Sequence, residues 1–414
     1  MIYSISPFSA NGTIESVPSK SFAHRIIILS CLSKGKTIIK NVGYSDDIMA
    51  TCSCMQSLGV KIQREGKNLM VFGIEKLPKK AYLDFNESGS TMRFLLPIVC
   101  ALGVETEWTG SGKLLSRPNT ALYNALIDKG INVKENKISG KLTSGQYVID
   151  QSVSSQFISG LILALPLLKE KSTIKLVGNK VSRNYVDITL KIASEFGLKY
   201  KVTDDTIDII STNGFTSCGE YVVEGDWSGA AFPLAFGVLS GRVKISNLNN
   251  NSLQGDREIV DVIKNMGGKV TVKDNVIIAE KSQLNGVTLS VEQIPDLAPV
   301  IASLMAYAKG ASKLLNVDRL KIKESNRLNA IIENLSLAGI KTEYKDNSLT
   351  IYGASPKGAN FKGYNDHRIV MSACVLSCLA EGNSTISDVE SVNKSYPEFF
   401  SHFNKIGGKY NVDI

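Results

Sequence analysis

What the sequence lacks already narrows the class of protein that it encodes. The first eight residues, MIYSISPF, contain no basic stretch followed by an apolar run, so no secretory signal is expected. The longest apolar stretch, residues 157–168, is interrupted by Ser159, Gly160 and Pro166 and is too short to span a bilayer. We therefore expect a cytoplasmic protein that has no membrane partner.

Residues that commonly bind metals are also scarce. The chain has three histidines, and its seven cysteines are an odd number that implies no disulfide framework. Cys52 with Cys54 and Cys374 with Cys378 form close pairs, but no second pair or histidines follow at the spacing of a zinc site. We expect reduced, structural thiols, no metal and no other cofactor.

Charge and aromatic content leave two kinds of partner open. The net charge is +8, which either nucleic acid or a small anionic substrate would explain. Aromatic residues make up only 7% of the chain, whereas proteins that bind single strands stack bases on aromatic side chains among basic ones. The lysines are scattered rather than gathered in runs. We therefore favour small anionic substrates and expect no nucleic-acid partner, with a non-catalytic nucleic-acid-binding repeat protein as the alternative.

The clearest positive signal is a unit that recurs six times. An amphipathic stretch ends at a glycine and is followed by a short, lysine-rich pair of strands, as in MGGKVTVKDNVIIAE. Each glycine suits the left-handed residue that ends a helix, and the alternation after it suits a hairpin. The glycines lie 67 to 72 residues apart, at Gly59, Gly130, Gly197, Gly267, Gly339 and Gly407. Spacing of this regularity indicates a structural repeat.

A second helix, apolar on nearly every side, is predicted upstream of each amphipathic one. A helix of this kind is expected to be buried. The six begin near Lys20, Gly89, Ser154, Asp226, Asp296 and Asp366. Each unit thus runs from a buried helix through an amphipathic helix to a hairpin, and six units in two groups of three predict a two-domain α/β protein.

Polar residues gather at the N-terminal ends of the apolar helices, where free N–H groups and the helix dipole favour anions. Ser88, Asp226 and Asp366 could equally be plain N-caps. Capping does not account for cations in the same places, because a cation there opposes the dipole. These cations are Lys20, Arg25, Arg93 and Arg368. They favour an anionic ligand shared by several helix starts.

The segments that carry these residues resemble one protein family, in the same order along the chain. They include SKSFAHRIIILS, ESGSTMRFLLP, SSQFISGLILALPLL, SRNYVDITL, EGDWSGAAFPLA, PDLAPVIA, KIKESNRL, NDHRIVMS and KSYPEFF. From residue 18 to about residue 400 the set resembles the 5-enolpyruvylshikimate-3-phosphate (EPSP) synthases. The UDP-N-acetylglucosamine enolpyruvyl transferases resemble the chain less, since they have Lys-Asn where it has Lys20-Ser21 and a loop cysteine where it has Gly112.

The resemblance implies a fold as well as an activity. It implies six βαβαββ-like repeats, three per domain, with buried parallel helices and an active site in the cleft between the domains. Residues 1–15 and 229–414 would form the domain that contains both termini, and residues 16–228 would form the other. We expect a monomer.

The implied reaction is an addition followed by an elimination. The 5-hydroxyl of shikimate 3-phosphate attacks C2 of phosphoenolpyruvate while C3 is protonated, and the tetrahedral intermediate then loses phosphate. By resemblance, Asp296 accepts the hydroxyl proton, Glu324 shuttles the proton at C3, and Lys20 is catalytic as well. Asp366 and His367 would support the loop around them.

The resemblance also implies two sets of substrate contacts. Those to shikimate 3-phosphate would be Lys20, Ser21, Arg25, Ser154, Ser155, Gln156, Ser182, Tyr185, Asp296, Arg319 and Lys323. Those to phosphoenolpyruvate would be Lys20, Gly89, Arg117, Gln156, Arg327, Arg368 and Lys394. Arginine suits this chemistry because its planar fork binds a carboxylate or a phosphate through two hydrogen bonds.

Plainer interpretations exist for several of these residues. Asp296 could be an N-cap, Tyr185 a packed aromatic and Lys394 a solvated lysine. Arg327 lies three residues after Glu324, the spacing of an ordinary intrahelical ion pair.

The chain also departs from the common pattern of the family at three places. Val17-Pro18 stands where Pro-Gly is usual, Asn86-Glu87 where Gly-Asn is usual, and Arg319 where many members have asparagine. We expect these changes to affect individual contacts rather than the reaction.

Overall fold

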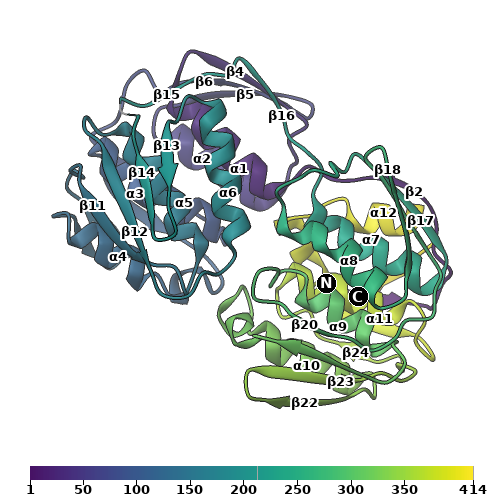
Figure 1. The fold of residues 1–414 in the computed structure, drawn as a ribbon. Coiled ribbons are helices and arrows are strands. Elements are labelled where there is room, and N and C mark those ends of the chain that lie inside the picture. The colour runs from purple at the N-terminus through teal and green to yellow at the C-terminus, as the bar shows by residue number, and fades with distance from the viewer. Residues whose placement is uncertain (212, 414) are drawn as a thin grey trace. The chain divides into compact units, whose positions relative to one another are not determined.

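The computed structural model describes residues 1–211 and 213–413, and the chain divides into two compact units (Figure 1). The terminal unit comprises residues 1–17 and 224–414, and the central unit comprises residues 18–223. The boundaries expected from the sequence differ by a few residues. The second of them would fall inside a helix that begins at Trp227, and the carboxylate of Asp226 caps that helix through the N–H of Gly229. The whole helix start therefore belongs to the terminal unit.

The central unit contains six α-helices and two 3-10 turns among its described residues. They are α1 (Lys20–Leu32), α2 (Asp46–Ser57), α3 (Gly89–Leu102), η1 (Leu114–Ser116), α4 (Thr120–Ile127), α5 (Ser155–Ala164), η2 (Leu165–Leu167) and α6 (Arg183–Glu195). Its strands are β3 (Ser33–Lys34), β4 (Lys36–Lys40), β5 (Lys61–Glu65), β6 (Asn68–Phe72), β7 (Lys80–Asp84), β8 (Glu105–Thr109), β9 (Asn132–Lys134), β10 (Lys137–Ser139), β11 (Gln146–Asp150), β12 (Ser172–Val177), β13 (Tyr200–Val202), β14 (Thr206–Ile209), β15 (Phe215–Thr216) and β16 (Glu220–Val222).

The terminal unit repeats this content. Its helices and 3-10 turns are α7 (Trp227–Ser240), η3 (Gly255–Glu258), α8 (Ile259–Asn265), α9 (Ala298–Ala306), η4 (Asp318–Ile322), α10 (Arg327–Leu337), α11 (His367–Ser377), η5 (Val389–Lys394) and α12 (Phe399–Lys405). Its strands are β1 (Ile2–Ile5), β2 (Asn11–Glu15), β17 (Arg242–Ser246), β18 (Lys269–Lys273), β19 (Val276–Glu280), β20 (Thr288–Ser290), β21 (Ala311–Leu315), β22 (Lys341–Lys345), β23 (Ser348–Tyr352), β24 (Asn360–Phe361), β25 (Ser384–Ser387) and β26 (Tyr410–Asp413).

One sheet plan recurs in both units. Within the described residues each unit has three four-stranded sheets, and each sheet joins a parallel pair of strands to an antiparallel pair. In the sheet β7-β8-β10-β9, for example, β7 and β8 are parallel and β10 returns antiparallel to both β8 and β9. Residues along β11 alternate between exposed and buried, so that sheet packs only one face on the core. The repeat predicted from the glycine spacing is therefore a real structural unit.

The six repeat glycines end helices α2, α4, α6, α8, α10 and α12, and all have positive φ, from 76° to 102°. The last repeat nevertheless differs from the prediction of a local hairpin. Only β26 follows Gly407, and its antiparallel partner is β1 from the other end of the chain, with Ile5 opposite Tyr410. The sequence-based interpretation missed this because the two strands lie at opposite ends of the sequence.

Three buried helices form the centre of each unit, α1, α3 and α5 in one and α7, α9 and α11 in the other. Every residue of α7 is buried, as its nearly all-apolar sequence predicts. Helices α3 and α5 pack closely because Gly160 has no side chain. A Cβ atom at that position would lie 2.3 Å from the carbonyl oxygen of Arg93. Among the described residues no helix is both long and apolar enough to cross a membrane.

Candidate active site

In the central unit the predicted residues lie at the starts of packed helices. Lys20 is the first residue of α1, Gly89 the first of α3, and Ser155 the first of α5. The hydroxyl oxygens of Ser88 and Ser154 accept hydrogen bonds from the first turns of α3 and α5, so both residues are N-caps. Capping and a role at the anion site are compatible, because each cap leaves other N–H groups of its helix start available.

Arg25 is a buried cation whose hydrogen-bond partners are all neutral. Its guanidinium donates to the hydroxyl of Thr189 at 2.7 Å, to the hydroxyl of Ser159 at 3.3 Å, and to the carbonyl oxygens of Ser21 and Tyr185. Burial lowers its pKa to about 9. A buried charge is stable only when it is compensated, so an anion bound beside Arg25 would relieve this cost.

Lys20 already has an acidic partner in this structure. Its Nζ lies 2.6 Å from the Oδ2 of Asp47, which belongs to the first turn of α2. An acid at a helix start is favoured by the dipole, and here it also fixes the lysine side chain. An incoming anion would therefore share Lys20 with Asp47 or replace it.

Arg93, which the sequence suggested as an anion-binding cation, instead joins several of the predicted residues. It donates to the Oε1 of Gln156 at 2.7 Å, to the Oδ1 of Asn119 at 2.9 Å and to the carbonyl oxygen of Pro118. Asn119 in turn donates to the carbonyl oxygen of Arg117. Arg93 thus fixes both the Gln156 side chain and the loop that carries Arg117.

Arg117 lies directly over the start of α3. A Cβ atom on Gly89 would be only 2.7 Å from the Nη1 of Arg117, so the glycine leaves the space that the guanidinium occupies. Ser182 and Tyr185 lie at the start of α6, with Ser182 in the left-handed conformation at φ 50°. The carbonyl oxygen of Tyr185 accepts a hydrogen bond from Arg25. The backbone of Tyr185 therefore has a structural role that does not depend on its aromatic ring.

The terminal unit gathers its predicted residues around one carboxylate. The Oδ1 of Asp296 accepts from Arg327 at 2.8 Å and lies 3.4 Å from the Nζ of Lys323, and its Oδ2 accepts from Arg368 at 3.3 Å. Burial alone would raise the pKa of Asp296, but Arg368, Lys323 and Arg327 hold it well below its usual value. Helix α9 begins two residues later with no side-chain cap, so the interpretation of Asp296 as an N-cap is wrong.

Arg327 is fully buried and joins three acids. It donates to Asp366 at 2.8 Å, to Asp296 at 2.8 Å and to Glu324 at 2.6 Å. An ion pair with Glu324 is therefore present, but Glu324 precedes α10, which begins at Arg327, so the pair is not the intrahelical one that the sequence left as an alternative. It does not displace a role for Arg327 at the site, because the same guanidinium orients both predicted catalytic carboxylates, Asp296 and Glu324.

Asp366 is the N-cap of α11 and accepts from the backbone N–H of Arg368 at 3.0 Å. Capping, the interpretation left open from the sequence, is thus correct for Asp366, as it is for Ser88. Asp366 also accepts from the hydroxyl of Ser325 and from Arg327. Burial would raise the pKa of Asp366, but the guanidinium of Arg327 holds it below its usual value.

Three further predicted cations of this unit, Arg319, Lys323 and Lys394, have contacts of their own. Burial lowers the pKa of Lys323 to about 8, and the nearby Arg319 and Arg327 also lower it. Arg319 donates to the carbonyl oxygen of Glu292 at 3.1 Å. Lys394 is buried and donates to the carbonyl oxygen of Asn365 at 2.6 Å, so the interpretation as a solvated lysine is wrong.

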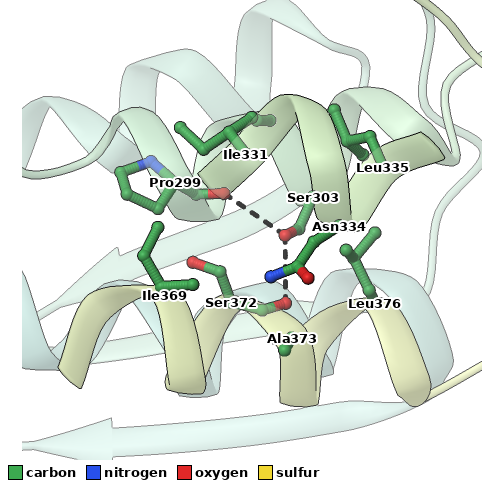
Figure 2. A pocket seen from close by; sticks show the side chains of 10 residues that line it. Pro299, Ser303, Ile331, Asn334, Leu335, Ile369, Ser372, Ala373 and Leu376 are labelled. Atoms are coloured by element: carbon green, nitrogen blue, oxygen red, sulfur yellow. Dashed lines mark hydrogen bonds between the residues drawn. The ribbon is translucent and has the colours of Figure 1, made fainter. Parts of the chain in front are cut away.

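Just beyond the cluster, helices α9, α10 and α11 leave a small pocket, shown in Figure 2. The hydroxyl of Ser303 contacts the carbonyl oxygens of Pro299 and Ser372 across it. Pro299 and Ile369, which also line the pocket, lie close in sequence to Asp296 and Arg368. The pocket therefore touches the same three helices that carry the site.

Comparison with known proteins agrees with this geometry. The family model of EPSP synthase (3-phosphoshikimate 1-carboxyvinyltransferase) matches residues 6–403. A 3-phosphoshikimate 1-carboxyvinyltransferase of Clostridium kluyveri is 39% identical over 414 residues, which cover 98% of this chain and 97% of that protein. The chain belongs to the EPSP synthase family.

Two further matches extend the comparison. The 3-phosphoshikimate 1-carboxyvinyltransferase of Clostridium novyi is 38% identical over 421 residues, covering 98% of this chain and 97% of that one. The solved EPSP synthase structure from Acinetobacter baumannii has a TM-score of 0.84 and covers 99% of this chain and 100% of that one. Its identity is only 22%, so this likeness shows the two-domain fold alone.

Glu87 is one of the places where the sequence suggested a departure from the common pattern of the EPSP synthase family. A Cβ atom on Gly112, whose φ is +57°, would lie 2.5 Å from the Oε2 of Glu87. The backbone N–H of Ser111 also donates to the carbonyl oxygen of Asn86. Glu87 therefore packs on the loop that leads to Arg117, which is a positional role that the sequence did not reveal.

Two buried acids of the chain were not among the residues predicted from the sequence. Asp47 holds Lys20, and Asp256 is a buried carboxyl that accepts a hydrogen bond from the hydroxyl of Ser228. Asp47 lies in the first turn of the amphipathic helix α2, and Asp256 lies in η3, the turn directly before the amphipathic helix α8. An acid at a helix start is common, because it interacts favourably with the helix dipole. Only their burial, at 9% and 3% exposure, distinguishes them from ordinary helix-start acids.

Proposed function

We propose that the chain transfers the enolpyruvyl group of phosphoenolpyruvate to the 5-hydroxyl of shikimate 3-phosphate and releases phosphate. Membership of the EPSP synthase family supports this, as do the similar proteins named 3-phosphoshikimate 1-carboxyvinyltransferase. The observation that carries the chemistry is the ionised Asp296 beside Glu324, with both carboxylates held by Arg327. This arrangement supplies a base and an acid within one hydrogen-bonded group.

Asp296 acts as the base for the 5-hydroxyl. In the structure its low pKa makes it a weak base, because Arg368, Lys323 and Arg327 stabilise its charge. When the carboxylate and phosphate of phosphoenolpyruvate engage Arg327 and Arg368, these cations become less available to Asp296. The pKa of Asp296 then rises and its ability to accept a proton increases. Substrate binding thus strengthens the base.

Glu324 delivers the proton to C3 and recovers it when the tetrahedral intermediate loses phosphate. Its Oε2 is fixed by the Nη2 of Arg327, which limits its motion. The predicted contacts of the central unit, including Lys20, Arg25, Gln156 and Arg117, hold the anionic groups of the substrates. That one active site draws on both units, that the chain is a monomer in the cytoplasm, and that it binds no nucleic acid stay predictions.

Phosphate release with two acceptors tests this function. With phosphoenolpyruvate present, we expect phosphate to appear with shikimate 3-phosphate and not with UDP-N-acetylglucosamine. The sequence favours the first acceptor, because Ser21 and Gly112 stand where the second family has asparagine and cysteine. Release with UDP-N-acetylglucosamine alone would show that the acceptor was assigned wrongly, and release with neither would refute the reaction.

A further inference from the structure

Four buried polar side chains of the central unit, to which the reaction assigns no role, are hydrogen-bonded in a row. The Nδ1 of His24 lies 2.7 Å from the hydroxyl oxygen of Thr51. That oxygen lies 2.7 Å from the hydroxyl oxygen of Thr91, which in turn lies 2.7 Å from that of Ser88. All four residues, which form the polar network, are fully buried. Buried polar groups are costly unless they are bonded, so each member of the network depends on the next.

The polar network joins three helices. His24 belongs to α1 and Thr51 to α2, while Thr91 belongs to α3 and Ser88 is the N-cap of α3. A threonine inside a helix often bonds only to the backbone of its own helix. The bond of Thr51 to the carbonyl oxygen of Asp47 is of this kind, but at 3.3 Å it is longer than the two bonds of 2.7 Å to the other helices. Thr51 is therefore the residue at which the three helices are tied together.

The polar network lies one helical turn below the ion pair of Lys20 and Asp47. His24 follows Lys20 by one turn of α1, and Thr51 follows Asp47 by one turn of α2, so each lies on the same side of its helix as the residue above it. The hydroxyl oxygens of Thr51 and Thr91 lie 3.3 and 3.5 Å from the carbonyl oxygen of Asp47. The carboxylate of Asp47 binds the Nζ of Lys20 at 2.6 Å. The network thus holds the residue that holds Lys20.

His24 takes part in the polar network as a neutral ring. Burial, together with the charges of Lys20 and Arg25, holds the pKa of His24 well below its usual value. Its Nε2 is buried and has no hydrogen-bond partner among residues 1–211 and 213–413, so the ring bonds to Thr51 alone. The network therefore places no net charge beside Lys20, and its effect on that lysine is one of position.

We propose that Thr51 is a positioning residue for phosphoenolpyruvate, because its hydroxyl keeps Lys20 at a fixed distance from the start of α3 at Gly89. The inference rests on the proposed function, which assigns phosphoenolpyruvate to both Lys20 and Gly89. Without the hydroxyl, α1, α2 and α3 lose the hydrogen bonds that tie their first turns together. The two groups must then be brought to their positions as the anion binds, and the affinity falls by that cost.

The test is Thr51→Val, which keeps the size and branching of the side chain and removes the hydroxyl. We expect KM for phosphoenolpyruvate to rise about fivefold, the factor that corresponds to one ordinary hydrogen bond, with kcat within about twofold of wild type. KM for shikimate 3-phosphate should change little, because most of its predicted contacts in this unit lie at the starts of α5 and α6, outside the polar network. Thr51→Ser retains a hydroxyl and should restore KM for phosphoenolpyruvate to nearly the wild-type value.

Two further variants keep the test decisive. Thr37 is a fully buried threonine of β4 in the same unit, and its hydroxyl lies 2.7 Å from that of Ser217, outside the polar network. Thr37→Val is the matched control, which should lower thermal stability as Thr51→Val does and leave both KM values unchanged. Thr91→Val breaks the network at the next residue and should reproduce the selective rise. Combining it with Thr51→Val should add little, because both remove the bond between Thr51 and Thr91.

An active wild type with unchanged KM for phosphoenolpyruvate in either valine variant that folds would overturn this inference alone. An equal rise of both KM values, or a defect in Thr51→Ser as large as in Thr51→Val, would likewise overturn it, since neither follows from positioning by the hydroxyl. If neither valine variant folds, the network serves the fold rather than the anion, and the inference fails as well. A wild type that releases no phosphate would instead refute the proposed function.

Discussion

Two buried carboxyl groups of the terminal unit have pKa values that are shifted in opposite directions. Asp366 accepts from the guanidinium of Arg327, from a serine hydroxyl and from a backbone N–H, and its pKa is lowered. Asp256 has one hydroxyl donor, and its pKa is raised to about 6. The number and charge of the donors, rather than burial itself, thus decide whether a buried acid is ionised.

This contrast predicts a pH-dependent effect of Asp366→Asn on stability. Because the folded-state pKa of Asp366 is depressed, its stabilising contribution is complete above the unfolded pKa near 4 and is lost as the pH falls through the folded value. Removing this charge takes away one of the three acidic partners of Arg327, so we expect a loss of about 2 kcal/mol near pH 7. Urea unfolding followed by circular dichroism measures it, and the difference from wild type should shrink below about pH 4.

Asp346→Asn is the matched control for that experiment. Asp346 lies in a hairpin turn with its side chain 85% exposed and φ at 50°, a conformation that asparagine also adopts well. It should change stability by less than about 0.5 kcal/mol. Equal stability of wild type and Asp366→Asn at neutral pH would contradict the role given to Asp366.

At the scale of elements, most of the candidate site residues lie at the starts of helices. The caps Ser88, Ser154, Asp226 and Asp366 each bind one N–H of their own helix and leave the others available. The helices themselves are held by contacts deeper in the core, such as the close approach of α3 and α5 at Gly160. The position of the site therefore depends on packing well away from it.

The small pocket among α9, α10 and α11 offers a test of that packing (Figure 2). The hydroxyl of Ser303 is hydrogen-bonded to carbonyl oxygens of α9 and α11, whereas the buried hydroxyl of Ser372 has no hydrogen-bond partner in the described part of the chain. We expect Ser303→Ala to lower stability by about 1 kcal/mol, and Ser372→Ala to leave it unchanged or raise it by a similar amount. Paired thermal or urea unfolding measures both, and the reverse order of stability would show that this hydrogen bonding is misassigned.

At the scale of the whole molecule, the net charge is concentrated in one unit. Residues 18–223 contain 26 lysines and arginines and 18 acids, whereas the terminal unit contains 21 of each. The entire excess of +8 therefore belongs to the central unit. A field of this kind attracts anionic substrates at long range and is screened by salt.

We expect kcat/KM for shikimate 3-phosphate to fall roughly tenfold between about 20 mM and 500 mM potassium chloride, because the Debye length shrinks to a few ångströms. Steady-state phosphate release measures the effect. A neutral osmolyte at the same osmolality is the control and should leave kcat/KM nearly unchanged. A salt-independent rate would mean that the charge of the central unit does not assist binding.

The sequence by itself determined the family, the number of repeats, the places where the buried helices begin and the identity of most candidate residues. These follow from signals along the chain: apolar periodicity, glycines at fixed spacing and ordered motifs. The periodicity depends on neighbours within a few residues, and the spacing and the order are properties of the linear sequence, so neither needs knowledge of the fold.

Only the tertiary structure decided which of these residues touch. The pairing of β1 with β26, the bonds of Arg327 to Asp296 and Asp366, and the hold of Arg93 on Gln156 all join segments far apart in the sequence. Local propensity carries no information about such contacts, and burial, which sets the ionisation of each group, exists only once the helices have packed.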